Sequence, residues 1–290
     1  MRERGKTFSR KVVTALAVTV AAASMLAVDL SAALSVSAAT RPFRTDPVTT
    51  ASNTSPIKDV NAECPSGTRV IGGGGRASGP GSNPVRLTQL IPVFNGANLF
   101  RVVAEAPNGV STASWQLTAY AICAGGLTDQ NYKIVAKSVF SAQPQQATSV
   151  GCPSGMRAIG SGALAFAEDP GKVGLFLNRT DGALGISRAI AHVGAGGYNK
   201  SWLLTTYAVC TTQYPLARYQ DGFGPFQASA SCRTGELALS AGSGTGLTPD
   251  GRPVFLRVVE PFPDLHGVFV SGTNTEIVNF GVLATAVCSP

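Results

Sequence analysis

The six cysteines are the residues of this 290-residue chain with the most reactive side chains. Thiolates bind zinc, usually in closely spaced pairs such as C-x-x-C and often together with histidine. The chain has no such pair and only two histidines, His192 and His266, so we expect no metal site and no cofactor. An even number of cysteines in an exported chain favours disulfides. They are Cys64, Cys123, Cys152, Cys210, Cys232 and Cys288.

A threefold repeat selects one pairing among those that six cysteines allow. Each copy opens with a cysteine, in the motif C-P-S-G twice and C-R-T-G in the third copy. Each copy also closes with a cysteine, in the motif W-x-x-x-x-Y-A-[IV]-C, of which the third copy keeps A-V-C. The repeat therefore predicts the disulfides Cys64–Cys123, Cys152–Cys210 and Cys232–Cys288. Closing a loop of this length stabilises a fold by about 4 kcal/mol in the chain-entropy model.

No catalytic arrangement emerges from the remaining polar residues, and we predict that the protein is not an enzyme. A serine hydrolase needs Ser, His and an acid, and the sequence has no G-x-S-x-G elbow. The carboxylates are scattered, which gives no paired set for glycoside hydrolysis. The run Gly72–Gly75 is not followed by G-K-[ST], and small residues recur at the matching places of the other copies, so we interpret it as tight backbone packing.

The aromatic residues of the closing motif separate into two faces. Trp115 and Trp202 are replaced by Phe280 in the third copy, as expected at a core position that needs a large apolar ring. Tyr120 and Tyr207 lie on the opposite face of the same strands. We take these two tyrosines as candidate surface contacts, together with His192 and His266, which have no counterpart in the other copies.

The closing segments alternate apolar and polar residues over nine positions, which predicts β-strands. Similar runs bounded by Gly, Pro, Asn and Asp give about four strands in each copy, and no helical period appears after the N-terminal region. Three such units can close around a pseudo-threefold axis and remove exposed sheet edges. The predicted fold is therefore an all-β, prism-like arrangement of three repeats, with a β-trefoil as the alternative.

The two repeated motifs resemble repeats in uncharacterised secreted proteins of actinobacteria. This resemblance covers most of residues 61–290. More distantly, three units that begin with a C-P-x-G motif resemble the β-prism of vitelline membrane outer layer protein I. The second resemblance implies a prism of three sheets.

The N-terminal region predicts export. Residues 1–39 combine a basic start, an apolar centre and small residues at the end, as in a signal peptide; a retained membrane anchor is the alternative. Without this region the net charge falls from +7 to +4, because five basic and two acidic residues lie in it. The basic residues that remain are scattered, so we expect no nucleic-acid partner. A secreted, extracellular protein without membrane insertion is predicted.

The mature chain is expected to have two parts. Residues 40–60, rich in Thr, Ser and Pro, predict a flexible N-terminal tether. Residues 61–290 predict a single β domain with repeats at 61–124, 149–211 and 229–290.

Two functions fit a rigid scaffold without catalytic groups. The first is a non-catalytic protein-interaction or adaptor module in an extracellular assembly, which docks through the tether by adding a strand to a partner's sheet. The alternative is a lectin-like module that binds carbohydrate or cell wall, as the resemblance to β-prism proteins implies. The partner is then an extracellular protein or a cell-surface glycan.

Overall fold

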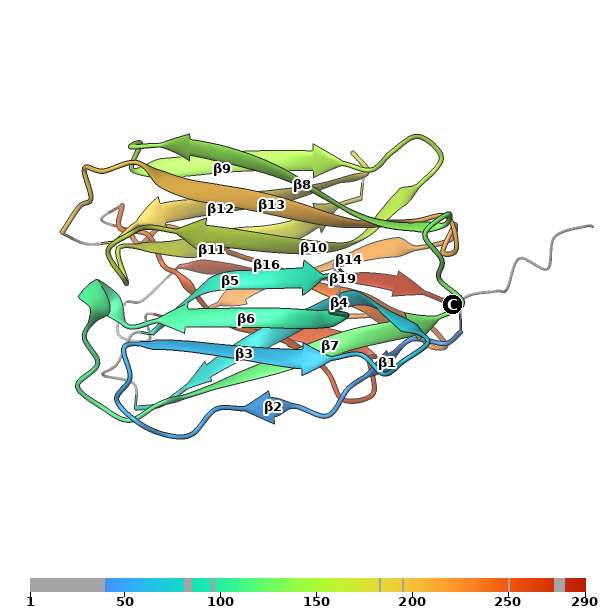
Figure 1. Ribbon diagram of the computed structural model, residues 1–290, viewed down its shortest axis with the longest axis horizontal. Helices are drawn as coiled ribbons and strands as arrows, with labels where there is room; N and C mark the ends of the chain where they lie inside the picture. Colours follow the sequence, from blue (N-terminus) through green and yellow to red (C-terminus); the bar gives the residue numbers. More distant parts are fainter. Residues whose placement is uncertain are drawn as a thin grey trace, which may run out of the picture. The chain divides into compact units, whose positions relative to one another are not determined.

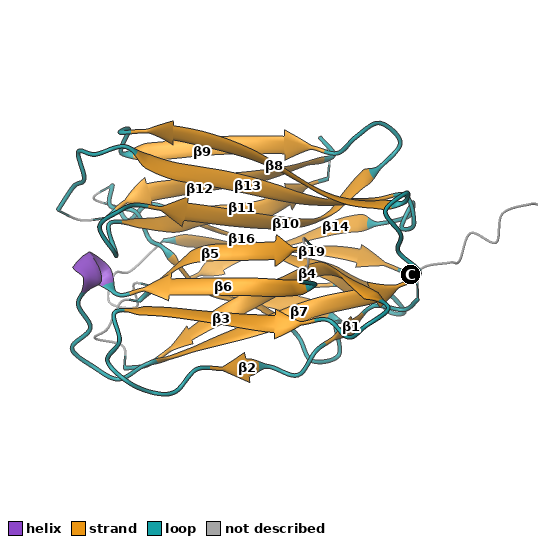
Figure 2. Cartoon of the chain, in the orientation of Figure 1, coloured by secondary structure: helices purple, strands orange, loops and turns teal. Residues whose placement is uncertain are grey.

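The computed structural model describes residues 40–80, 85–94, 97–182, 184–194, 196–249, 251–273 and 280–290 (Figure 1). The expected signal peptide, residues 1–39, lies outside these ranges. The described chain is almost entirely β-strand, and its one helix is the short 3₁₀ turn η1 (Pro107–Gly109) (Figure 2). The all-β class predicted from the alternating sequence pattern is confirmed.

The strands form three antiparallel sheets. In spatial order, the first sheet contains β1 (Phe43–Arg44) with β2 (Val48–Thr49), then β7 (Gln116–Gly125), β4 (Thr68–Ser78), β17 (Leu256–Pro261), β18 (Gly267–Gly272) and β15 (Gln227–Ser231). The second contains β3 (Ile57–Glu63), β6 (Leu99–Glu105), β5 (Arg86–Val93), β10 (Arg157–Phe166), β13 (Trp202–Thr211) and β8 (Tyr132–Ser141). The third contains β14 (Arg218–Pro225), β19 (Gly281–Ser289), β16 (Leu237–Thr245), β11 (Val173–Asp181), β12 (Ile186–Val193) and β9 (Gln145–Gly151).

Each sheet combines strands of two repeats. The third strand of each repeat pairs with the second strand of the next, as β5 with β10, β11 with β16 and β17 with β4. The sixth strand of a repeat then pairs with the fifth strand of the next, as β8 with β13 and β14 with β19. This exchange interlocks the repeats around a pseudo-threefold axis. The fold is the predicted prism-like one rather than the alternative β-trefoil.

The repeats are larger than the four strands expected from the sequence. The first two have six strands each, β3–β8 and β9–β14. The extra strands come from the connectors between the predicted repeats, which contain β8 and β14 and the first residues of β9 and β15. β8 and β14 lie at sheet edges, where most side chains on both faces meet solvent, so they need no strict alternation of apolar and polar residues.

Residues 40–50 pair with β7 in the first sheet and residues 57–60 begin β3 in the second, so this stretch is paired with strands and is not the free tether that was predicted. β1 pairs with β7 at Phe43↔Cys123, and β2 pairs with it at Val48↔Ala119. The segment occupies the place that β8 and β14 have in the other two sheets. Thr and Pro, which favour a tether by composition, are also tolerated in an edge strand.

The three disulfides are the predicted ones, Cys64–Cys123, Cys152–Cys210 and Cys232–Cys288. Each joins the loop before the second strand of a repeat to that repeat's fifth strand. Trp115, Trp202 and Phe280 are at most 2% exposed, so their assignment to the core is confirmed.

Small residues allow the second strands to approach one another near the axis. Gly72 and Gly160 stand at equivalent β-bulges in β4 and β10. A Cβ atom at Gly160 would collide with the carbonyl oxygen of Ile71, and one at Gly72 with that of Leu239. The packing role predicted for the Gly72–Gly75 run is thereby confirmed.

Candidate interaction surface

The outer face of the third sheet carries a continuous apolar row across all six strands. Its members are opposite one another in the ladders of successive strand pairs. The row consists of Phe223, Leu283, Gly244, Leu177, Ile190 and Ala147. It faces outward, because the alternate residues of the same strands, such as Ala284 and Ala189, belong to the buried core. Six strands at the usual spacing give the row a length of about 24 Å.

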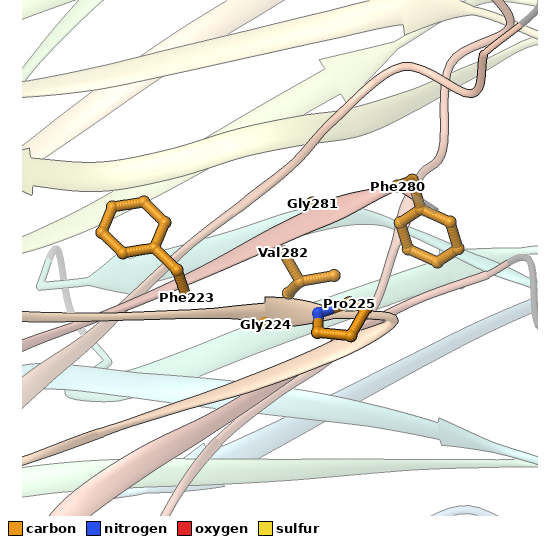
Figure 3. A pocket seen from close by; sticks show the side chains of 6 residues that line it. All are labelled: Phe223, Gly224, Pro225, Phe280, Gly281 and Val282. Atoms are coloured by element: carbon orange, nitrogen blue, oxygen red, sulfur yellow. The ribbon is translucent and has the colours of Figure 1, made fainter. Parts of the chain in front are cut away.

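The row ends at Phe223, whose side chain is largely exposed. It lies on the edge strand β14 and is 78% exposed. Beside it is a shallow cleft of about 410 Å³, lined by Phe223, Gly224, Pro225, Phe280, Gly281 and Val282. Figure 3 shows the Phe223 ring at one side of this cleft, with Pro225 and Val282 between it and Phe280. The cleft lining is almost wholly apolar, which fits an apolar ligand group.

A polar rim lies next to the apolar row on the same face. Arg179 makes ion pairs with Asp181 over 3.7 Å and with Asp221 over 3.6 Å. Arg188 pairs with Asp181 over 3.8 Å. The Asp221 carboxylate also accepts a hydrogen bond of 2.6 Å from the Thr285 hydroxyl. The two arginines and two aspartates of the rim neutralise one another. A partner therefore does not need charged groups at this place.

One of the four predicted contact residues, His192, borders the apolar row. It follows Ile190 by two positions on β12 and therefore lies on the same outer face. Its ring contacts Phe176 with centroids 4.7 Å apart. Burial lowers the pKa of His192, which favours the neutral imidazole and adds to the apolar character of the face.

The other three residues lie elsewhere, so the structure does not bring the predicted set together. Tyr120 is on β7 of the first sheet and only 5% exposed, because the Arg44 guanidinium lies 4.9 Å from its ring centroid. Its predicted surface exposure is wrong, since the covering segment was expected to be free. Tyr207, on β13 of the second sheet, is half-buried. His266 is exposed in the turn between β17 and β18.

The environment of His266 is that of a turn residue. Its backbone N–H donates to the Asp264 carboxylate over 3.0 Å, and its Nδ1 lies 3.2 Å from the carbonyl oxygen of Glu236. Among the residues that the structure describes, no three His, Cys, Asp or Glu side chains gather in a way that would hold a metal ion.

Sequence reasoning missed Phe223 and the row that it ends. The residues of the row come from the second and third repeats, and only the ladder registers bring them into line. An available signal was Phe223 itself, a large apolar ring beside Gly224 and Pro225 in a connector between the predicted repeats. Exposed aromatic rings in a connector are typical of binding surfaces rather than of a core.

Comparison with known proteins gives no family for this chain. No family model matches it, and no curated protein matches it. No helix within the described ranges is long and apolar enough to cross a membrane. The three intramolecular disulfides are typical of extracellular proteins.

Proposed function

We propose that this protein is a secreted, non-catalytic protein-binding module whose partner docks on the outer face of the third sheet. The observation that carries the proposal is the apolar row with the 78% exposed Phe223 at its end. All members of the row except Gly244 are exposed or half-buried, and apolar surface that is accessible across a sheet in this way is a feature of interaction sites. An aromatic anchor beside a shallow cleft is the usual centre of binding energy in a protein interface.

The chemistry of this face favours a protein partner over a glycan. Sugars are recognised through many directed hydrogen bonds in addition to ring stacking, because each hydroxyl that loses water needs a new partner. The cleft beside Phe223 is lined mainly by apolar atoms. Two polar side chains of the adjacent rim, Asp221 and Thr285, already bond to each other. The expected partner is therefore an extracellular protein that presents an apolar strip of similar length.

Replacing Phe223 by Ser tests this proposal. We expect partner affinity to fall by about tenfold or more, as for an aromatic side chain that a partner buries. The full-length protein and the variant are used to capture partners from the medium of the producing cells. Captured chains are identified by mass spectrometry, and the affinity of the purified partner is then measured by calorimetry.

The chain offers a matched control in Phe140→Ser. Phe140 is 69% exposed on β8, the edge strand of the second sheet, so its loss removes a similar exposed ring from another face. Partner affinity should be unchanged by this variant. Equal affinities of the Phe223 and Phe140 variants would contradict the proposal. Retention of cell-wall glycan in place of a protein, with loss in the Phe223 variant, would instead favour the carbohydrate-binding alternative.

A further inference from the structure

The N-terminal segment, residues 40–50, is bound to β7 by a repeated threonine contact. Its sequence contains the pattern T-x-P-Φ-x twice, where Φ is Phe43 or Val48, followed by Thr50. Each of three threonines, five residues apart, donates its backbone N–H to the carbonyl oxygen of a β7 residue. The hydroxyl oxygen of the same threonine accepts from that residue's N–H. The pairs are Thr40 with Gly125 (3.1 and 2.7 Å), Thr45 with Ala121 (2.9 and 3.3 Å) and Thr50 with Leu117 (2.9 and 3.0 Å).

This pattern lets five residues of the segment span four residues of β7. The threonine hydroxyl takes the place of a backbone carbonyl where the segment bulges away from the ladder. Pro42 and Pro47 lie between the threonines and have no N–H to donate. The hydrogen bonds to the edge of β7 therefore fix how residues 40–50 align with that strand.

The segment forms fewer ladder pairs than the strands in the equivalent positions. β1 and β2 make ladder pairs at two positions each, whereas β8 makes ten and β14 makes eight. Phe43 and Val48 remain 38% and 43% exposed, so neither side chain belongs to the buried core. A segment with few buried apolar contacts has a low free energy of local opening.

The chain immediately after the segment is firmly anchored. The Trp115 indole N–H donates to the carbonyl oxygen of Ser55 over 2.8 Å, and the Lys58 ammonium donates to that of Ala51 over 3.0 Å. A cleft of about 660 Å³ separates the segment from β3. Residues 40–50 can thus leave β7 by a change at residues 50–51, without breaking the ladder between β3 and β6.

We propose that residues 40–50 exchange between two copies of the chain, so that the segment of one copy docks on β7 of the other. Departure of the segment exposes the hydrogen-bonding edge of β7, which favours uptake of another strand. A second copy offers a strand with the same three threonine contacts. The bonds lost in one molecule are regained in its partner, which is the usual basis of strand exchange. The exchange is independent of the proposed function, because it concerns the first sheet.

A cysteine cross-link distinguishes exchange from internal pairing. Thr49 and Thr118 are opposite each other in the β2–β7 ladder, with hydroxyl oxygens 2.9 Å apart. Directly opposed residues of an antiparallel pair are close enough for a disulfide. The single variants Thr49→Cys and Thr118→Cys, distinguishable by mass, are made in the full chain, mixed and oxidised. We expect a covalent heterodimer on non-reducing gels, in a yield that rises with protein concentration.

The second sheet supplies a matched control pair. Ser138 and Thr205 are opposite each other in the β8–β13 ladder, with hydroxyl oxygens 2.8 Å apart. Thr205 and Thr118 each stand five residues before the closing cysteine of their repeat. Mixed Ser138→Cys and Thr205→Cys proteins should form no heterodimer above the level of random collision, because β8 pairs along its whole length.

Two results would overturn the proposal. The double variant Thr49→Cys/Thr118→Cys, in one chain, reports whether the two positions are in register. If it cross-links internally but the mixed single variants give no more heterodimer than the control pair, exchange does not occur. If the double variant does not cross-link, the register on which the proposal rests is wrong.

Discussion

Replacing Arg86 by Met is expected to lower the free energy of unfolding by about 3–5 kcal/mol at neutral pH. Arg86 is 4% exposed and stands opposite Glu105, which is 9% exposed, in the β5–β6 ladder. The Arg86 guanidinium donates to the carbonyl oxygen of Gly171 over 2.7 Å, and the Glu105 carboxylate accepts from the N–H of the same residue. Removing the arginine leaves a buried carboxylate without its neutralising charge, which accounts for the large cost.

The cost of this substitution should depend on pH in a specific direction. Burial raises the pKa of Glu105 above its ordinary value, and the attraction of Arg86 opposes that rise. Without Arg86 the pKa in the folded state rises further, while the unfolded value is unchanged. An acid with a raised folded pKa loses stability as pH increases from its unfolded pKa to its folded one. The variant should therefore approach the wild-type stability below pH 4.5, the ordinary pKa of a glutamate, and fall behind it above that pH.

The measurement is urea unfolding with the disulfides intact, at acidic and at neutral pH. The control is the double variant Arg86→Met/Glu105→Gln, in which neither charge remains. Its stability should exceed that of Arg86→Met and should show much less dependence on pH. The single variant Glu105→Gln is measured as well. If the double variant is destabilised by the sum of the effects of Arg86→Met and Glu105→Gln, the two residues are not coupled.

The disulfides and the buried rings were predictable from the sequence because each recurs in register. The third copy retains its cysteines and replaces Trp by Phe280, which identifies a covalent link and a core position without knowledge of the fold. The alternation around Tyr120 also gave the correct face of β7. Its burial was not predictable, because Arg44 covers it from a segment more than seventy residues earlier in the chain.

The pairing of strands from different repeats within the chain was not predictable for a similar reason. The pairing of β5 with β10 joins residues of two repeats, and nothing local in either strand specifies its neighbour. The apolar row depends on five ladders at once, two of which join different repeats. The threonine contacts were closer to detection, since the spacing of Thr40, Thr45 and Thr50 is visible in the sequence. The prediction of a tether used only the amino-acid composition of residues 40–60, which contains no information on the spacing of the threonines.

Trp202→Ala is expected to lower the free energy of unfolding by about 3–5 kcal/mol, the range for removal of a fully buried large ring. Trp202 is 1% exposed. Its indole N–H donates to the carbonyl oxygen of Gln143 over 2.9 Å, and its own carbonyl oxygen accepts from the Gln146 side chain over 2.9 Å. The ring thus fills the core and also fixes the link between β8 and β9, which belong to different sheets.

Trp202→Phe should cost much less, about 1–2 kcal/mol, because it keeps most of the ring and loses one hydrogen bond. The third repeat supports this expectation, since it has Phe280 at the same position. There Phe226, which like Gln146 stands six residues before the opening cysteine, packs edge-on against the ring with centroids 5.3 Å apart. Denaturant unfolding of both variants, with Phe280→Ala as a matched loss of a ring, tests the comparison. If Trp202→Phe is as unstable as Trp202→Ala, the hydrogen bond to Gln143 and not the buried volume secures this corner of the fold.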